Sequence, residues 1–144
     1  MDKLNIYTIG FTQKSAEKFF RLIKNENIKI LIDTRLNTSS QLAGFAKKED
    51  LKYFLKEICH VNYSYHQELA PTKTILDAYK KNKGSWEIYE KEFMELMYKR
   101  NIEKIFTEEM MNDACLLCSE DKPHYCHRRL VAEYLDNHWK VKLT

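Results

Sequence analysis

The sequence has no long hydrophobic run. Its longest apolar stretches, such as residues 30–32 and 116–117, fall far short of the roughly 20 residues that a membrane-spanning helix needs. The first residues also lack the charged segment followed by an apolar segment that marks a secretory signal. We therefore expect a cytoplasmic protein with no membrane partner.

A strong charge of one sign is absent as well. The 24 lysines and arginines against 21 acidic residues give a formal net charge of +3, short of the bias that marks a dedicated nucleic-acid binder. Internal repeats, low-complexity segments and domain linkers are also lacking, and 144 residues suit one domain. We expect residues 1–144 to form a single domain, and nothing in the sequence indicates its oligomeric state.

Four cysteines, Cys59, Cys115, Cys118 and Cys126, are present in a chain without an evident export signal. Cytoplasmic residence predicts reduced thiols rather than a disulfide framework. Each thiol must then be explained as a core residue, a ligand or a nucleophile.

Segments typical of strands and helices alternate along the chain. Strands are expected at residues 5–9, 28–33, 62–65, 114–118 and 139–143, and helices near residues 15–23, 51–58 and 127–137. Residues 72–111 form a helical tract, with one apolar stripe that includes Phe93 and a second that includes Ile105 and Met110. The alternation predicts an α/β fold, a three-layer sandwich with a mainly parallel sheet and helices on both faces.

Polar residues follow the predicted strand ends, where ligand sites of such sheets lie. Gly10 follows the first strand. Asp33 and Arg35 are two residues apart and can face one pocket, or they can form a structural pair that fixes the next loop. In that loop Ser40 can help to hold an anion or satisfy the loop backbone, and His66 can reach the same edge from the weak strand that ends at residue 65.

The segment from residue 117 to residue 129 is the richest in reactive side chains. Cys126 falls at the start of the last predicted helix, where the positive helix end favours a thiolate nucleophile. His127 can serve as a base or donor, and Arg128 can bind phosphate or carboxylate. In the alternative, Cys126 is a small apolar core residue and Arg128 pairs with Glu120 or Asp33.

A metal site needs consideration because Cys115 and Cys118 have a spacing seen in zinc sites. On a strand, residues three apart point to opposite faces, so these two thiols cannot meet at one ion. Cys118, Cys126 and His127 with a carboxylate form a looser possible set whose spacing is not diagnostic. We therefore assign no metal and no cofactor from the sequence.

Several motifs, taken in order, resemble the uncharacterised family known as domain of unknown function 488. The leucine-cysteine-x-glutamate step that ends at Glu120, followed by cysteine-histidine-arginine at 126–128, is the most specific part. The other matching segments are residues 7–10, 31–35 with Ser39 or Ser40 and Phe45, 65–66 and 68–69.

The resemblance implies an α/β sandwich with a polar site at the matching positions, and it implies no reaction. The sequence departs from the family pattern in two places. Phe11 stands where the family usually has histidine, which puts a chemical role for that position in doubt. Ala70 and Pro71 replace small residues and can reshape a loop.

Together these observations suggest an enzyme that acts on a phosphate-bearing substrate, a nucleotide or nucleic acid. The alternative is a non-catalytic module that binds nucleic acid or an acidic ligand, and a third, less favoured class is a structural or sensory zinc protein. The residues assigned to catalysis are Asp33, Glu120, Cys126 and His127, and those assigned to substrate binding are Gly10, Arg35, Ser40, His66, Cys118 and Arg128.

Overall fold

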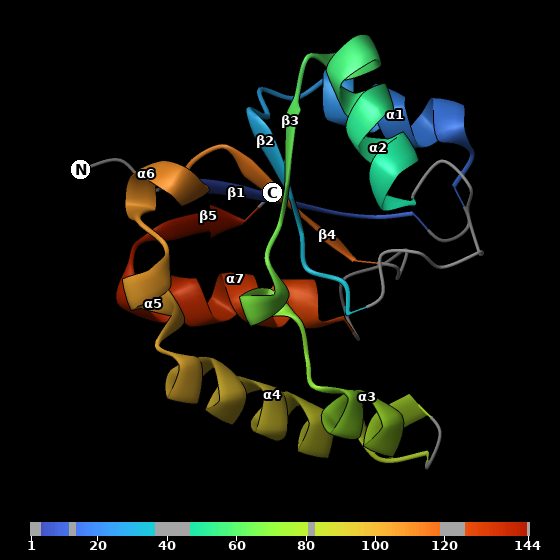
Figure 1. Ribbon diagram of the computed structural model, residues 1–144. Coiled ribbons are helices and arrows are strands. Elements are labelled where there is room, and N and C mark those ends of the chain that lie inside the picture. The colour runs from blue at the N-terminus through green and yellow to red at the C-terminus, as the bar shows by residue number, and fades with distance from the viewer. Residues whose placement is uncertain (1–3, 12–13, 37–46, 81–82, 119–125, 144) are drawn as a thin grey trace.

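A five-stranded parallel sheet forms the centre of the computed structural model (Figure 1). The structure describes residues 4–11, 14–36, 47–80, 83–118 and 126–143. The strand order is β3-β2-β4-β1-β5. The strands are β1 (Leu4–Gly10), β2 (Ile30–Asp33), β3 (Asn62–Tyr65), β4 (Ala114–Cys118) and β5 (Val141–Leu143).

One face of the sheet is covered by α1 (Ala16–Lys24), α2 (Lys48–Phe54) and the π-helical turn η2 (Leu55–Cys59). The Ser15 hydroxyl caps α1 by accepting a hydrogen bond from the backbone N–H of Lys18 at 3.1 Å. Phe19 of α1 packs with Leu31 of β2 and Leu117 of β4 in the apolar core on this side. We refer to it as the α1 face.

The opposite face is covered by α7 (His127–His138), and α4 (Trp86–Arg100) packs against α7. Phe93 of α4 and Leu130 of α7 share a core with Ile32 of β2 and Leu116 of β4. We refer to this side as the α7 face. The shorter elements around it are the 3-10 turn η3 (Gln67–Leu69), α3 (Lys73–Lys80), α5 (Ile102–Ile105) and α6 (Glu108–Met111).

The predicted fold class is confirmed, because helices cover both faces of a parallel sheet. Within the described parts of residues 72–111, the expected helical tract is divided into four helices. Asn101 adopts a left-handed conformation with φ of 54° and ends α4, and Thr107 caps α6 through its side chain. Within the described ranges, no helix has the length and apolarity to cross a membrane.

The direction of the chain after each strand positions the polar residues. The helices that follow β1 and β2 lie on the α1 face, whereas the helix that follows β4 lies on the α7 face. β4 lies between β1 and β2 in the sheet. The chain therefore leaves the end of β4 toward the α7 face, whereas it leaves the neighbouring ends of β1 and β2 toward the α1 face. Ligand sites of parallel sheets lie at such points.

The core on the α7 face should respond strongly to truncation within α4. Met97 is fully buried, so Met97→Ala should lower the free energy of unfolding by about 2–5 kcal/mol. Ile88 is 58% exposed on the same helix, and Ile88→Ala should change the free energy by no more than about 0.5 kcal/mol. Urea unfolding followed by circular dichroism measures both. Equal losses would contradict the assigned orientation of α4.

Candidate functional site

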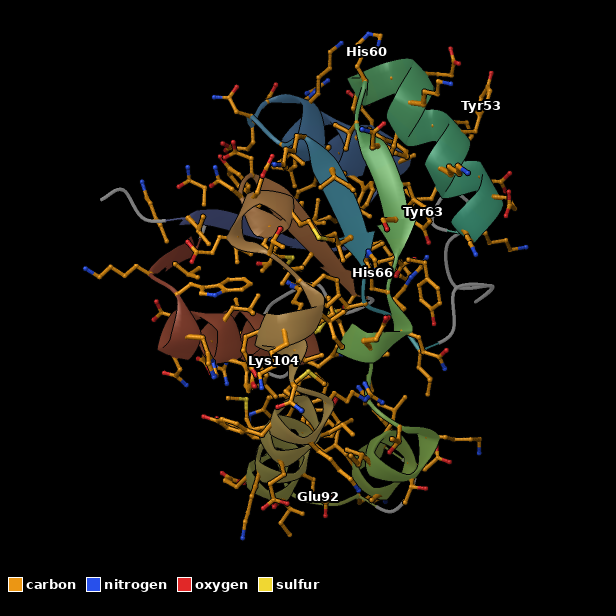
Figure 2. All side chains as sticks on the ribbon, turned by 60° about the vertical axis from the view of Figure 1, so that its left-hand side comes forward. Tyr53, His60, Tyr63, His66, Glu92 and Lys104 are labelled. Carbon is orange, nitrogen blue, oxygen red and sulfur yellow. A yellow bond between two sulfur atoms is a disulfide. The ribbon has the colours of Figure 1, made fainter. Side chains whose placement is uncertain are left out.

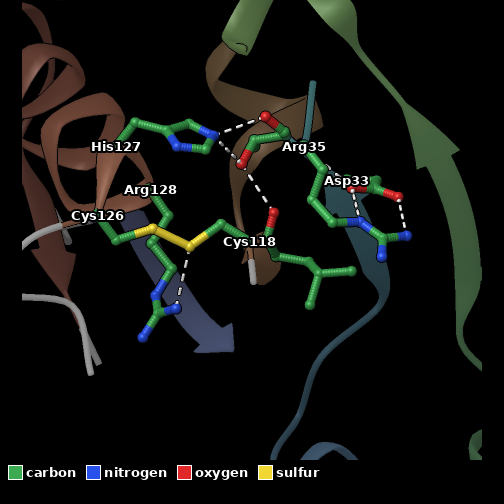
Figure 3. The surroundings of a disulfide bond; sticks show 8 residues. Asp33, Arg35, Cys118, Cys126, His127 and Arg128 are labelled. Carbon is green, nitrogen blue, oxygen red and sulfur yellow. Dashed lines mark hydrogen bonds and ion pairs between the residues drawn. A yellow bond between two sulfur atoms is a disulfide. The ribbon is translucent and has the colours of Figure 1, made fainter. Parts of the chain in front are cut away.

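The carboxyl ends of β1, β2 and β4 bring most of the predicted site residues to one edge. Gly10 is aligned with Cys118, and Asp33 is aligned with Leu117. Figure 3 shows the residues gathered around this edge. Ser40 and Glu120 lie outside the described residues.

Asp33 and Arg35 form a closed, buried ion pair. Arg35 donates from Nε to Oδ1 of Asp33 at 2.9 Å and from Nη2 to Oδ2 at 2.8 Å. The Arg35 backbone N–H also donates to the same carboxylate, and the side chains are 4% and 0% exposed. The guanidinium carbon lies 5.4 Å from the centre of the Phe11 ring. These contacts favour the structural alternative, in which the pair fixes the chain after β2.

Tyr63 on β3 binds to this pair as well, although no feature of the sequence distinguished it from other tyrosines. Its hydroxyl donates to Oδ2 of Asp33 at 2.6 Å. Burial, followed by that hydrogen bond, raises the pKa of Tyr63 well above its ordinary value. The phenol therefore stays protonated and supports the carboxylate.

His66 lies at the end of β3, on the side of β2 that is away from β4 (Figure 2). Its backbone N–H donates to the carbonyl oxygen of Asp33 at 3.1 Å, which places it at the predicted edge. Its ring bonds to the hydroxyl of Ser64 at 2.7 Å and packs edge-on against Phe106. In the part of the chain that the structure describes, the imidazole therefore contacts residues that support the fold.

Thr34, between Asp33 and Arg35, connects β2 with β4 and α7. Its backbone N–H and its hydroxyl both donate to the carbonyl oxygen of Leu117, at 3.0 and 2.7 Å. Nε2 of His127 lies 2.6 Å from the Thr34 carbonyl oxygen and 3.0 Å from its hydroxyl. A carbonyl oxygen can only accept, so Nε2 carries a proton, and in the neutral ring Nδ1 carries the lone pair. Sequence reasoning passed over Thr34, although strand alternation places it opposite its charged neighbours.

The sulfur atoms of Cys118 and Cys126 meet next to His127 and are joined as a disulfide (Figure 3). The expectation of four reduced thiols is therefore wrong for this pair, whereas Cys59 and Cys115 are free. The physical reason is tertiary: β4 ends at Cys118, and the chain returns to start α7 at the same place, with Cys126 as the N-cap residue. The spacing of the two cysteines in the sequence does not by itself predict that their side chains meet.

Arg128 lies beside the disulfide and is 1% exposed. Its Nη1 donates to the sulfur atom of Cys118 at 3.1 Å. The predicted alternative partners were Asp33 and Glu120. Asp33 is instead bound by Arg35 and Tyr63 on the α1 side of β2.

A cavity of about 300 Å³ opens on the α1 face beside β1, and Arg128 reaches its wall. We refer to it as the Gly10 cavity. Lys14 also lines it and is held in the turn after β1, where its backbone N–H donates to the carbonyl oxygen of Phe11 at 3.2 Å. The sequence prediction did not include Lys14. Its position between the end of β1 and the helix cap at Ser15 could have indicated that it lies near the strand ends. The lining residues are Tyr7, Thr8, Ile9, Gly10, Lys14, Leu22, Ile23, Glu26, Ile28, Cys115 and Arg128.

Comparison with known proteins places the chain in a family. The family model described as "Domain of unknown function DUF488" matches residues 15–135. The chain belongs to this family. The matched range includes both cysteines of the disulfide, His127 and Arg128, whereas the predicted motif at residues 7–10 precedes it. No curated protein and no solved structure matches the chain.

The buried ion pair should be important for stability. Asp33→Asn leaves the Arg35 guanidinium buried without its counter-charge, which should cost about 3–5 kcal/mol in the free energy of unfolding. Glu17→Gln is the matched control, because Glu17 pairs with Arg21 on the exposed surface of α1 and should change stability little. Chemical denaturation of both variants tests this. An Asp33→Asn protein as stable as the control would argue against a structural role for the pair.

The two free thiols should differ in reactivity and in pH dependence. Burial raises the pKa of Cys115 to about 12, and burial also raises the pKa of Cys59, which is only partly covered. Because the thiolate is the reactive form, maleimide labelling of Cys59 should be slow near neutral pH and accelerate as pH rises. Cys115 should be labelled only after unfolding. Peptide mass mapping of the oxidised protein distinguishes the sites, and rapid labelling of Cys115 in folded protein would contradict its buried position.

Proposed function

We propose that the protein is an enzyme that binds a phosphate-bearing small molecule in the Gly10 cavity and acts on it with the neighbouring thiols. The observation that carries the proposal is the wall of this cavity, where Gly10 at the carboxyl end of β1 lies with the cations Lys14 and Arg128. Lysine and arginine are the usual side chains for phosphate recognition.

The charges along the cavity support a ligand with two different ends. Gly10 and Tyr7 both line it, and they lie three residue steps apart on β1, a separation of about 10 Å. Burial and the nearby carboxylates of Asp113 and Glu26 raise the pKa of Tyr7. The cavity therefore has cations near Gly10 and a carboxylate near Tyr7, which suits a phosphate at one end and a hydrogen-bond donor at the other.

The volume favours a small ligand over a nucleic-acid strand. A cavity of about 300 Å³ is at the lower limit of small-molecule sites, which span about 300–1,000 Å³. A nucleoside monophosphate has the required phosphate and a polar base at the opposite end. It is the first substrate class that we would test.

Catalysis in this proposal requires the reduced cysteines. Cys126 is the N-cap residue of the 12-residue helix α7, whose positive end favours a thiolate. His127 follows directly, and Nδ1 of its neutral ring can take the thiol proton. In the proposed chemical step the Cys126 thiolate attacks the phosphorus of the bound phosphate ester, so that an S–P bond forms while the P–O bond to the alcohol breaks. The leaving alkoxide takes the proton that His127 received from the thiol, and water then hydrolyses the phosphocysteine to thiol and inorganic phosphate. Arg128 links the thiol pair to the Gly10 cavity.

The disulfide favours a second candidate function. In the disulfide, neither Cys118 nor Cys126 is a nucleophile. A protein that works in that form would be a binding module for an acidic ligand, in which Lys14 and Arg128 recognise charge without chemistry. The two functions differ in one observable, which is turnover under reducing conditions.

Ligand binding should depend on the cations of the Gly10 cavity. Calorimetry with adenosine monophosphate and with adenosine should show that the phosphate is required. Lys14→Ala should weaken binding of the monophosphate about tenfold, equivalent to about 1.4 kcal/mol. Lys91→Ala is the control, because Lys91 is exposed on α4 and does not line the cavity. Arg128→Lys keeps the charge but loses the planar fork and should also weaken binding.

Equal binding of adenosine and its monophosphate would contradict the proposal, as would equal affinities of the two lysine variants. The enzyme candidate is tested by product formation from a panel of nucleotides and sugar phosphates with the disulfide reduced. Cys126→Ser should then abolish turnover while phosphate-dependent binding remains. Phosphate-dependent binding without turnover in any reduced sample would contradict the enzyme candidate and support the binding module.

A further inference from the structure

Three side chains with metal-binding atoms converge where β4 ends and α7 begins. The sulfur atoms of Cys118 and Cys126 and a ring nitrogen of His127 all lie within 4.8 Å of one another. The three residues come from two elements that the fold brings together, since Cys118 ends β4, Cys126 caps α7 and His127 is its first residue. Two thiolates and one imidazole form a donor set that suits zinc.

The histidine is oriented as a metal-ligating histidine usually is. Its Nε2–H donates to the carbonyl oxygen of Thr34 at 2.6 Å, and Thr34 is itself fixed to Leu117 of β4. Protein metal sites commonly hold the second ring nitrogen of a histidine in this way, because the bond sets the tautomer and the ring direction. Figure 3 shows the remaining nitrogen, Nδ1, on the side of the ring that faces the two cysteines.

The spacing of the two cysteine backbones also suits an ion. Their Cα atoms are 7.3 Å apart, beyond the range of about 4.4–6.8 Å that is usual for disulfide-bonded cysteines. Two thiolates that share a zinc ion each lie about 2.3 Å from it, which separates the sulfur atoms and accommodates a wider backbone spacing.

The surroundings favour deprotonated sulfur. Nη1 of Arg128 donates to the sulfur of Cys118 at 3.1 Å, and the positive end of α7 lies at Cys126. A metal ion also requires both thiols in the thiolate form. Two thiolates balance the charge of a divalent ion, so the buried group would be neutral before Arg128 is counted.

We propose that Cys118, Cys126 and His127 bind one zinc ion when the two cysteines are reduced. Three protein ligands leave the fourth tetrahedral position to water or to a bound ligand, the arrangement found in catalytic zinc sites. Cys115 takes no part, because it belongs to the core on the α1 face and β4 points it away from Cys118.

The disulfide and the zinc site exclude each other, since they use the same sulfur atoms. A dithiol reductant transfers two electrons and two protons to the disulfide, becomes a disulfide itself and leaves two thiols on the protein. Zinc binding then releases the two thiol protons as the sulfurs coordinate. The disulfide form is therefore the metal-free, oxidised form of the same site. The thiolate attack proposed above belongs to a reduced form without metal, because zinc would occupy both the sulfur of Cys126 and Nδ1 of His127.

The experiment uses the full chain, purified with a phosphine reductant and without chelator. Elemental analysis should find one zinc per chain, and cobalt titration of the zinc-stripped protein should give the sulfur-to-cobalt absorption of a thiolate site. Cys118→Ser and His127→Ala should each lose stoichiometric zinc. Cys115→Ala and Cys59→Ser are matched controls that should retain it, because neither residue contributes to the cluster. Circular dichroism establishes that each variant is folded.

The cobalt spectrum of the unmodified chain keeps the proposal testable even if a variant fails to fold. A protein whose four cysteines are all reduced, yet which binds neither zinc nor cobalt, would overturn it. Zinc retained in a folded Cys118→Ser and Cys126→Ser double variant would overturn it too. The zinc site does not rest on the proposed phosphate ligand. A protein that binds zinc but shows no phosphate-dependent ligand binding in calorimetry would contradict only the proposed function. A protein that binds the monophosphate but no metal would contradict only the zinc site.

Discussion

A short chain of hydrogen bonds through Thr34 ties β2, β4 and α7 together at the carboxyl edge of the sheet. Leu117 accepts two hydrogen bonds from Thr34, and the Thr34 carbonyl oxygen accepts one from His127. Thr34 is fully buried, where each unmade hydrogen bond would cost about 1–3 kcal/mol. The same bonds fix the start of α7 and therefore the positions of Cys126 and Arg128. The sulfur cluster and one wall of the Gly10 cavity both depend on this anchor.

The pleat of β2 divides the polar residues into two groups. Asp33 and Arg35 turn to the α1 face, where Tyr63 meets them, whereas Thr34 between them turns to the α7 face and meets His127. A buried ion pair repays its desolvation only with good geometry and further hydrogen bonds, and Asp33 has both. Because the carboxylate is saturated in this way, the pair has a structural role, and the sulfur cluster lies on the other side of the strand.

Much of the fold could be predicted because its central strands, β2 and β4, are largely buried on both sides. Such strands are nearly continuous apolar runs, and all five residues of β4 are indeed buried. The apolar stripe from residue 102 onward predicted burial less accurately. Ile105 and Met110 are 42% and 43% exposed, because α5 and α6 are single turns with separate directions, and a continuous helical period does not apply across them.

The position of the candidate site could be predicted, but its internal pairing could not. Strand ends follow from local sequence, and the rule that ligand sites gather there needs only the order of strands and helices. The meeting of Cys118 with Cys126 depends on how the chain returns after β4, which is a tertiary property. Cys118 is aligned with Gly10 of the cavity in the sheet and touches Arg128 through its sulfur. One residue at the end of the central strand thus belongs to the sulfur cluster and contacts Arg128, which lines the Gly10 cavity, so the topology of the sheet is what brings the two together.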